Sequence, residues 1–381
     1  MKFDGVRVLI VDDNPFNRTL LAAILEGLGV GTVEMAGDGV EGLSALERTR
    51  FDLVLLDVMM PNMDGFEMCR RLRERHSRAE LPVLFVTAVD NPGQRAECFS
   101  AGGTDMVGKP LNVAEVSARV RVHIENRLLL AGLEQYQERV RHELSVARAA
   151  QFALLPEEAR LDNIRQRTGI SIEGMVETSS EMGGDFWTVF EPDRGSNRIG
   201  VLLADFAGHG VAASLNVFRL HALMSHRRSV MLGPGDLLAL LNRELKKLLA
   251  PGQFAAAFVG VLDGDAGTLT YAGAAMPPPL LVVDGQVTQL ETAGAPLGAF
   301  ADASYDEHVI AMPAGAALFA YSDALLETVV DGVAVVDEVA LPGWVADALG
   351  KPSPTAHILN RYRQWVPGDP PDDLTLVCVR R

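Results

Sequence analysis

The segment Leu53-Val-Leu-Leu-Asp57-Val-Met-Met-Pro61-Asn-Met-Asp-Gly65 decides the fold of the first third of this 381-residue chain. Its first four residues form an apolar run of the length of a fully buried strand, and the run ends in a carboxylate. The Pro, Asn, Asp and Gly that follow favour a turn before a helix. A buried strand followed by a helix is typical of a parallel sheet covered on both faces.

The same unit repeats on either side of this segment. Apolar runs predict further strands at 7–11, 32–36, 83–86 and 105–107, and amphipathic stretches predict helices near 16–28, 38–48, 64–75, 92–101 and from 112 onward. Five strands alternating with five helices predict an α/β domain with a doubly wound parallel sheet over residues 1–125. In such sheets, functional groups gather at the carboxyl ends of the strands.

Acidic residues lie at two of these strand ends. Asp12 and Asp13 follow the first strand, and Asp57 ends the third. Like charges packed together need a cation between them, so the three carboxylates predict a Mg²⁺ pocket. The hydroxyl of Thr87 and the ammonium of Lys109, which follow strands four and five, would contact phosphate oxygens on a modified carboxylate.

With Gly108-Lys109-Pro110, these motifs make residues 1–125 resemble a two-component receiver domain, which has a flavodoxin-like fold. The resemblance implies that a sensor histidine kinase phosphorylates Asp57. It also implies Mg²⁺ ligands, a switch hydroxyl and a phosphate partner, which are Asp12, Asp13 and Asp57, then Thr87, then Lys109. A receiver fold that is never phosphorylated is disfavoured because all five positions are filled. Met106 replaces the usual aromatic residue, so no aromatic rotamer switch is expected.

The fifth helix has no stop signal near residue 125. Apolar residues continue at spacings of three and four among many Glu and Arg, at Leu129, Leu133, Tyr136, Val140, Leu144 and Ala147. This pattern predicts a helical, coiled-coil stalk over residues 126–155 that pairs with a second copy of the chain. The alternative is a single helix packed on its own domain.

Residues 156–381 have a different texture. Strand-like runs lie at 170–177, 186–191, 198–204, 254–262, 268–273, 279–283, 305–310, 316–321 and 374–379, with helices near 211–227, 235–249 and 355–365. They predict an α/β sandwich of mostly antiparallel sheets. Four aspartates, Asp185, Asp205, Asp323 and Asp372, each lie at the start or end of a strand-like run. Such hard oxygen ligands suit Mg²⁺ or Mn²⁺.

Several motifs follow one another in this region. They are Ser179-Ser-Glu-Met-Gly-Gly-Asp185-Phe-Trp, Ala204-Asp-Phe-Ala-Gly-His-Gly210, Gly294-Ala-Pro-Leu-Gly298, Tyr321-Ser-Asp323 and Asp372-Asp-Leu-Thr375. In this order they resemble the bacterial branch of the PPM (type 2C) serine/threonine phosphatases, which includes sporulation and stress-response enzymes. The resemblance covers roughly residues 147–381.

The resemblance implies a site for two Mn²⁺ or Mg²⁺ ions that activate a shared water for phosphoester hydrolysis. Asp205 is then the bridging ligand and the Phe206 carbonyl binds one ion. Asp323 and Asp372 hold the other ion, and Asp185 contributes directly or through water. Asp373 is a weaker candidate because the family accepts Asp or Asn there.

The combined hypothesis is a response regulator in which phosphorylated Asp57 controls a metal-dependent phosphatase. By resemblance, its substrate is a phosphorylated anti-sigma-factor antagonist. The alternative is a phospho-gated adaptor that binds a regulatory protein with little catalysis. That alternative is motivated by Met276 and Ala324, where the family usually has His and Gly.

Bulk composition narrows the remaining classes. The formal charge of −16 disfavours a nucleic-acid partner, which needs a basic face. Cys69, Cys98 and Cys378 have no CxxC spacing and are expected to be reduced thiols. With no leader-like start and no apolar run of about 18 residues, a cytoplasmic protein without a membrane span is expected.

Overall fold

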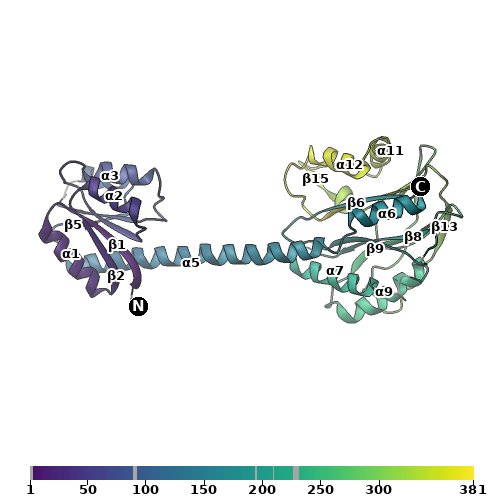
Figure 1. Ribbon diagram of the computed structural model, residues 1–381, viewed down its shortest axis with the longest axis horizontal. Coiled ribbons are helices and arrows are strands. Elements are labelled where there is room, and N and C mark those ends of the chain that lie inside the picture. Colours follow the sequence, from purple (N-terminus) through teal and green to yellow (C-terminus); the bar gives the residue numbers. More distant parts are fainter. Residues whose placement is uncertain (1–2, 89–91, 194, 209, 226–230) are drawn as a thin grey trace. The chain divides into compact units, whose positions relative to one another are not determined.

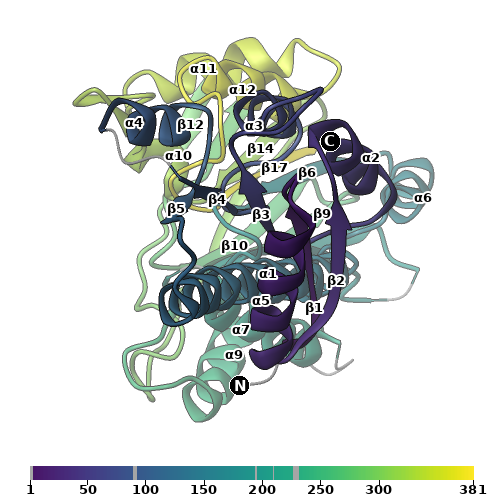
Figure 2. The ribbon, with the colours of Figure 1, turned by 90° about the vertical axis from the view of Figure 1, so that its left-hand side faces the viewer.

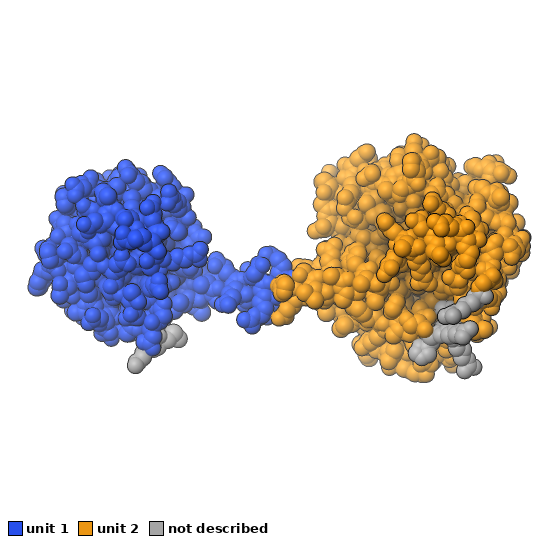
Figure 3. Space-filling model, in the orientation of Figure 1, with its two compact units in different colours: residues 1–141 blue, residues 142–381 orange. Residues whose placement is uncertain are grey.

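The structure is a computed structural model that describes residues 3–88, 92–193, 195–208, 210–225 and 231–381. His209, within the predicted glycine-rich motif, therefore lies outside the described residues. The chain divides into two compact units, residues 1–141 and 142–381 (Figure 3). Each unit has hydrophobic cores of its own.

The first unit is built on a five-stranded sheet in the order β2-β1-β3-β4-β5, with every pair of neighbours parallel. This confirms the predicted flavodoxin-like fold class. Its strands are β1 (Phe3–Val11), β2 (Val30–Ala36), β3 (Leu53–Asp57), β4 (Val83–Thr87) and β5 (Asp105–Gly108). Its helices are α1 (Pro15–Gly27), α2 (Gly39–Arg48), α3 (Gly65–Arg73), α4 (Pro92–Ser100) and the first part of α5 (Val113–Phe152).

Helices cover both faces of this sheet (Figures 1 and 2). Alternate residues of β1 point to opposite faces, as strand geometry requires. Val8 and Ile10 pack in a cluster with α1 and α5 residues, whereas Leu9 and Val11 pack in a cluster with α2 and α3 residues. The central strands β3 and β4 are therefore buried along their whole length, and polar side chains collect at the carboxyl ends of the strands.

The second unit contains two more five-stranded sheets, one in the order β13-β10-β9-β8-β7 and one in the order β12-β11-β14-β17-β6. All neighbouring strands in both are antiparallel. The first comprises β7 (Asp185–Phe190), β8 (Arg198–Phe206), β9 (Ala255–Asp263), β10 (Thr268–Ala274) and β13 (His308–Ala311). The second comprises β6 (Ser171–Glu177), β11 (Leu280–Val283), β12 (Gln286–Gln289), β14 (Ala317–Tyr321) and β17 (Leu374–Arg380).

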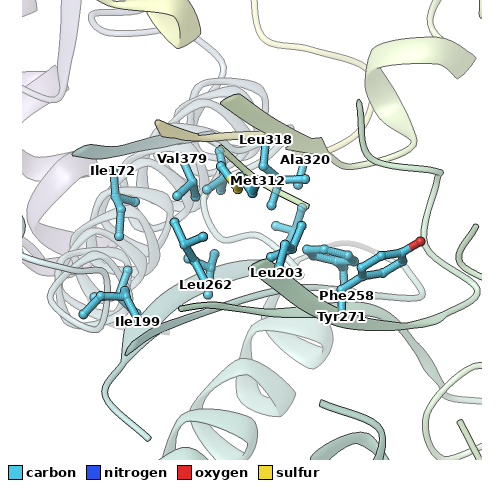
Figure 4. Close-up of a cluster of buried hydrophobic side chains, with 14 of the residues drawn as sticks. Ile172, Ile199, Leu203, Phe258, Leu262, Tyr271, Met312, Leu318, Ala320 and Val379 are labelled. Carbon is cyan, nitrogen blue, oxygen red and sulfur yellow. The ribbon is translucent and has the colours of Figure 1, made fainter. Parts of the chain in front are cut away.

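The two sheets pack face to face, and the layer between them is apolar (Figure 4). Leu203 and Phe258 of one sheet and Leu318 and Val379 of the other contribute to this layer. A second core joins the β7–β10 sheet to α7 (Val211–Met224) and α9 (Pro234–Leu248). A third joins the other sheet to α10 (Ala324–Glu327), α11 (Leu341–Leu349) and α12 (Pro354–Arg363). The result is the predicted α/β sandwich.

Some elements differ from the sequence-based expectation. The structure adds α6 (Glu158–Thr168), α10, α11, β12 and a short hairpin of β15 (Val329–Val330) and β16 (Val333–Ala334). The run predicted at 305–310 is the shorter strand β13. The described helices include none with the length and apolarity to cross a membrane.

Candidate functional site

Three carboxylates of the first unit meet at the carboxyl ends of β1 and β3. Asp12, Asp13 and Asp57 each bring one carboxylate oxygen within 4.8 Å of the others. Asp12 and Asp57 are buried, whereas Asp13 is exposed and leaves the group open to solvent. Thr87 is buried at the end of β4, the strand next to β3. The oxygen-only donor set with one open side fits Mg²⁺.

Lys109 compensates part of this negative charge. Its Nζ donates to Asp57 Oδ2 at 2.8 Å and to Asp12 Oδ2 at 3.0 Å. Burial raises the pKa of Asp57, and the ammonium of Lys109 lowers it only in part. For Lys109 burial disfavours the charged form, but the bonds to Asp57 and Asp12 outweigh it and raise its pKa. Asp12, Asp13, Asp57 and Lys109 thus lie together at this edge of the sheet, with Thr87 at the end of the neighbouring strand.

Asn17 is a member of this site that the sequence analysis missed. Its Nδ2 donates to both carboxylate oxygens of Asp12 at 3.1 Å. Asn17 lies in the first turn of α1, and the backbone N–H of Asn14 also donates to Asp12 Oδ1 at 2.8 Å. These donors fix the Asp12 carboxylate in place. The signal in the sequence was an amide residue in the first turn of the helix, three residues after the N-cap Asn14.

In the second unit, strand pairing sets the first two candidate ligands side by side. Asp185 begins β7 and Asp205 is the penultimate residue of β8, and the two are direct register partners. A Cβ added at Gly184 would lie 2.7 Å from the Phe206 carbonyl oxygen, so this close approach requires glycine. Gly210 has φ +79 and allows α7 to start directly after the strand.

The other two candidate ligands come from the opposite sheet. Asp323 precedes α10, and Asp372 lies just before β17. The Ser322 N–H donates to the Thr375 carbonyl at 3.0 Å, which ties the end of β14 to the start of β17. Burial decreases from Asp185, which is buried, through Asp205 and Asp323 to Asp372, which is exposed. The four carboxylates thus span from the core to the surface.

The electrostatics of these aspartates differ from those of the receiver site. Burial raises the pKa of Asp185 well above its ordinary value, and the charge of Asp205 adds to the effect. Burial, with the charge of Asp323, raises the pKa of Asp205 to about 7. Burial and the charges of Glu327 and Asp372 raise that of Asp323. Over the described part of the chain, no Lys or Arg forms an ion pair with any of the four.

A cation fits this electrostatic environment. Both carboxylate oxygens of Asp185 are buried without a partner in full hydrogen-bond geometry among the described residues, and the nearby hydroxyls of Thr375 and Ser322 offset only part of the rise in its pKa. An isolated buried carboxylate is costly unless it is paired or coordinates a metal. Within the described residues, these aspartates are less tightly grouped than the receiver trio. Asp185, Asp205, Asp323 and Asp372, with the Phe206 carbonyl, are the groups that would hold divalent ions here.

Asp373 has a different role from Asp372, the candidate ligand that precedes it. Its Oδ1 accepts from the Ser179 N–H at 2.7 Å and from the Ser179 hydroxyl at 3.0 Å. Its Oδ2 accepts from the Gly184 N–H at 2.5 Å. Both oxygens are thus engaged by the loop that leads into Asp185. Asp373 positions that loop, in keeping with its weaker standing as a ligand candidate.

The last turn of α5 contacts the same loop. Gln151 is buried, and its Nε2 donates to the Gly183 carbonyl at 2.7 Å. Its Oε1 accepts from the Gly183 N–H at 3.4 Å. Gly183 lies two residues before Asp185. The end of the long helix is therefore hydrogen-bonded to the segment that carries a candidate metal ligand.

Two family models match this chain, one in each of the two compact units. Residues 8–121 match the response regulator receiver domain family. Residues 195–381 match the family of Stage II sporulation protein E (SpoIIE). Among solved structures, the second unit is similar to the SiaA-PP2C domain of Pseudomonas aeruginosa. That match has a TM-score of 0.56 and 20% identity, and covers 65% of this chain and 98% of the other.

The curated relatives of this chain include response regulators. Response regulator PleD of Caulobacter vibrioides is 34% identical over 192 residues, which are 50% of this chain and 40% of PleD. DNA-binding dual master transcriptional regulator RpaA of Synechocystis sp. is 39% identical over 115 residues, 30% of this chain and 47% of RpaA. The chain thus spans less than half the length of these relatives.

The unpaired carboxylate of Asp185 predicts a stabilising substitution. In metal-free protein, Asp185→Asn removes a buried charge, and we expect the free energy of unfolding of the second unit to rise by about 1–3 kcal/mol at pH 8. An unfolded aspartate ionises near pH 3.9, whereas the pKa of folded Asp185 is raised. The wild type therefore loses stability as pH rises above about 4, and the difference from Asp185→Asn closes toward that pH.

Calorimetric unfolding of the full chain with EDTA measures this difference. Asp302→Asn, at an exposed carboxylate, is the matched control and should leave the transition unchanged. Added Mn²⁺ should stabilise the wild type more than Asp185→Asn, because the variant lacks one ligand oxygen charge. A variant that is less stable than the wild type without metal at pH 8 would contradict the assignment.

Proposed function

We propose that this chain, a response regulator receiver domain joined to a PPM-type phosphatase domain of the SpoIIE family, is a phosphorylation-controlled serine/threonine protein phosphatase. The buried, unpaired carboxylate of Asp185 beside Asp205 is the observation that carries the proposal. An adaptor without catalysis would have no need for this costly arrangement. By family resemblance, the substrate is a phosphorylated anti-sigma-factor antagonist.

The proposed reaction is hydrolysis of a phosphoserine or phosphothreonine ester. The oxygen of water forms a bond to phosphorus while the bond from phosphorus to the side-chain oxygen breaks. One water proton ends on the released hydroxyl and the other on inorganic phosphate. Bound Mn²⁺ or Mg²⁺ would supply an activated water at neutral pH. The half-buried carboxylates of Asp205 and Asp323 would provide ligand oxygens for these ions, and Asp373 fixes the loop of Asp185.

The hydrogen bonds of Gln151 support control of the site by the receiver. Any shift of the α5 end relative to the sandwich must break or carry along the two bonds to Gly183. Gly184, the next residue, donates to Asp373, and Asp185 follows. We infer that phosphorylation of Asp57 changes phosphatase activity through the position of α5 and this loop.

Met276 and Ala324, the two residues that differ from the family pattern and motivate the adaptor hypothesis, are both packed in hydrophobic cores. Met276 is buried in the core between the two sheets, and its carbonyl accepts from the Thr292 hydroxyl at 2.9 Å. Ala324 is buried at the start of α10 in the core beneath α11 and α12. Both side chains are apolar and fill apolar space. Neither adds a polar group to the carboxylate cluster, by which we mean Asp185, Asp205, Asp323 and Asp372. The observations therefore favour the enzyme over the adaptor.

The stalk supports a dimer. With 3.6 residues per turn, the buried residues Val116, Val120 and Ile124 lie on one side of α5. Leu129, Leu133, Tyr136 and Val140 fall on the opposite side, and the first three of these are 71%, 53% and 64% exposed. A stripe that faces away from its own receiver cannot be covered by it. We propose that a second copy of α5 covers this stripe.

Metal-dependent turnover tests the proposed activity. With Mn²⁺, the full chain should release phosphate from p-nitrophenyl phosphate and from a phosphorylated anti-sigma-factor antagonist. EDTA should abolish the activity. Asp205→Asn should lower kcat by at least about a hundredfold, because metal polarisation is worth several kcal/mol. Asp284→Asn, at an exposed carboxylate between β11 and β12, is the matched control, and full activity in Asp205→Asn would refute the metal site.

Beryllofluoride, a phosphoryl mimic, tests the coupling. It should change the turnover of the wild type by about threefold or more and leave Asp57→Ala unchanged. Gln151→Ala should lose the response while its receiver still binds beryllofluoride, because the link to Gly183 is cut. Gln364→Ala, at an exposed glutamine, is the control and should respond like the wild type. An undiminished response in Gln151→Ala would exclude this route.

Sedimentation of the full chain tests the stalk. The wild type should sediment as a dimer, and Leu129→Glu with Leu133→Glu should shift it to a monomer, because two charges would be buried in the seam. Val309→Glu, at an apolar residue exposed on β13, is the control for added charge. A monomeric wild type at micromolar concentration would contradict the proposed pairing.

A further inference from the structure

Five large apolar side chains are exposed along one side of the second unit. They come from the first turns of α7, the end of α9, the loop after α9 and the loop before β13. We name them the α7–α9 patch, which consists of Val211, Leu215, Leu248, Phe254 and Phe300, each between 41% and 65% exposed. Large apolar side chains exposed on segments that contact one another are candidates for an interaction site.

Hydrogen bonds hold the segments of the patch together. Arg219 of α7 donates from Nη1 to the Leu248 carbonyl at 3.0 Å. Asn242 of α9 is buried, and its Nδ2 donates to the Phe300 carbonyl at 2.8 Å. These bonds fix α7, the end of α9 and the loop before β13 to one another, so a partner would not have to order these segments on binding.

The patch adjoins the carboxylate cluster. The Ala207 N–H donates to the Phe254 carbonyl at 3.0 Å, and Ala207 follows the candidate ligands Asp205 and Phe206. Val211 is the first residue of α7. The apolar surface therefore starts within a few residues of the groups that would hold the metal ions.

The rim of the patch is basic in an acidic chain. On the same segments lie four exposed cations, Arg219, Arg243, Lys246 and Lys247. The acidic residues of these segments are Glu244, which pairs with Lys247 at 2.7 Å, and Asp302, with Asp236, Asp306 and Glu307. Glu307 accepts from the Gly235 N–H at the opposite end of α9, so the cations outnumber the carboxylates at the Leu248 end. Against a chain charge of −16, this local excess favours a negatively charged partner.

We propose that the α7–α9 patch docks a folded, acidic protein whose phosphoserine or phosphothreonine enters the carboxylate cluster. This inference rests on the proposed phosphatase function and names the surface that selects its substrate. A single phosphorylated side chain offers little contact area, whereas an apolar centre with a charged rim is typical of specific protein interfaces. Symmetric pairing with a second copy is disfavoured because it would bring like-charged rims together.

Steady-state kinetics of the full chain with two substrates test this proposal. The probes are p-nitrophenyl phosphate and each phosphorylated anti-sigma-factor antagonist of the source organism, prepared with its own kinase. Leu215→Glu and Phe300→Glu should each lower kcat/KM for the phosphoprotein at least about tenfold, mainly through KM. Turnover of p-nitrophenyl phosphate should stay within about twofold, because neither side chain lines the metal site.

A charge substitution and a control complete the series. Lys247→Glu should raise KM for the phosphoprotein most at low ionic strength and little at high salt. Val309→Glu adds the same charge on β13, the edge of the sheet opposite β7, and should leave both substrates unaffected. Wild-type kcat/KM on the phosphoprotein in Leu215→Glu and Phe300→Glu would overturn the proposal. An equal loss on p-nitrophenyl phosphate would also overturn it.

A binding experiment tests the docking proposal separately from the proposed phosphatase activity. Calorimetry with Asp205→Asn and the phosphoprotein should detect complex formation, and adding Leu215→Glu should weaken it at least about tenfold. If the wild type hydrolyses neither substrate, the phosphatase function is wrong, while this binding experiment still decides the patch. A change in sedimentation of the full chain on Leu215→Glu would assign the patch to self-association and overturn substrate docking.

Discussion

Burial of neighbouring carboxylates at the ends of strands, with their mutual repulsion added to it, is the constraint on which both sites depend. In the receiver, the ammonium of Lys109 lies 2.8 Å from Asp57 and 3.0 Å from Asp12, so the chain supplies a cation of its own. In the sandwich, the described residues supply none, and the pKa of Asp205 rises to about 7. The first site is therefore organised before any ion binds. The second is under electrostatic strain that bound divalent ions would relieve.

The loop before Asp185 is held in position by hydrogen bonds from two different elements. Asp373 holds the loop from the strand side and Gln151 holds it from the helix side. The loop therefore has two anchors, one within the sandwich and one on the element that continues toward the receiver. Because Asp185 is buried with neither oxygen satisfied, small displacements of its backbone have large electrostatic consequences.

Most of the fold could be predicted from the sequence because apolar runs with clear ends give strong signals. The elements that were missed have weak signals. Helix α6 buries Ile164 as its one fully buried side chain and has no side-chain cap, and β12 is a polar edge strand. The candidate ligands could be predicted from motifs, but the role of Asp373 in positioning the loop before Asp185 could not. Asp372 and Asp373 are successive residues, and successive side chains of an extended chain point to opposite sides. Only the tertiary structure shows that Ser179 and Gly184 lie against Asp373.

The register of α5 limits where two copies can pair. At 3.6 residues per turn, Val140, Leu144, Ala147 and Gln151 lie on one face, which continues the exposed stripe of Leu129 and its neighbours. At its far end this face is no longer free, since Gln151 is buried against Gly183. One helix face cannot contact a second helix and the loop at the same residues. In the proposed dimer, pairing of the stalk would therefore end before Gln151, and any change that extended it to Gln151 would have to release the loop that carries Asp185.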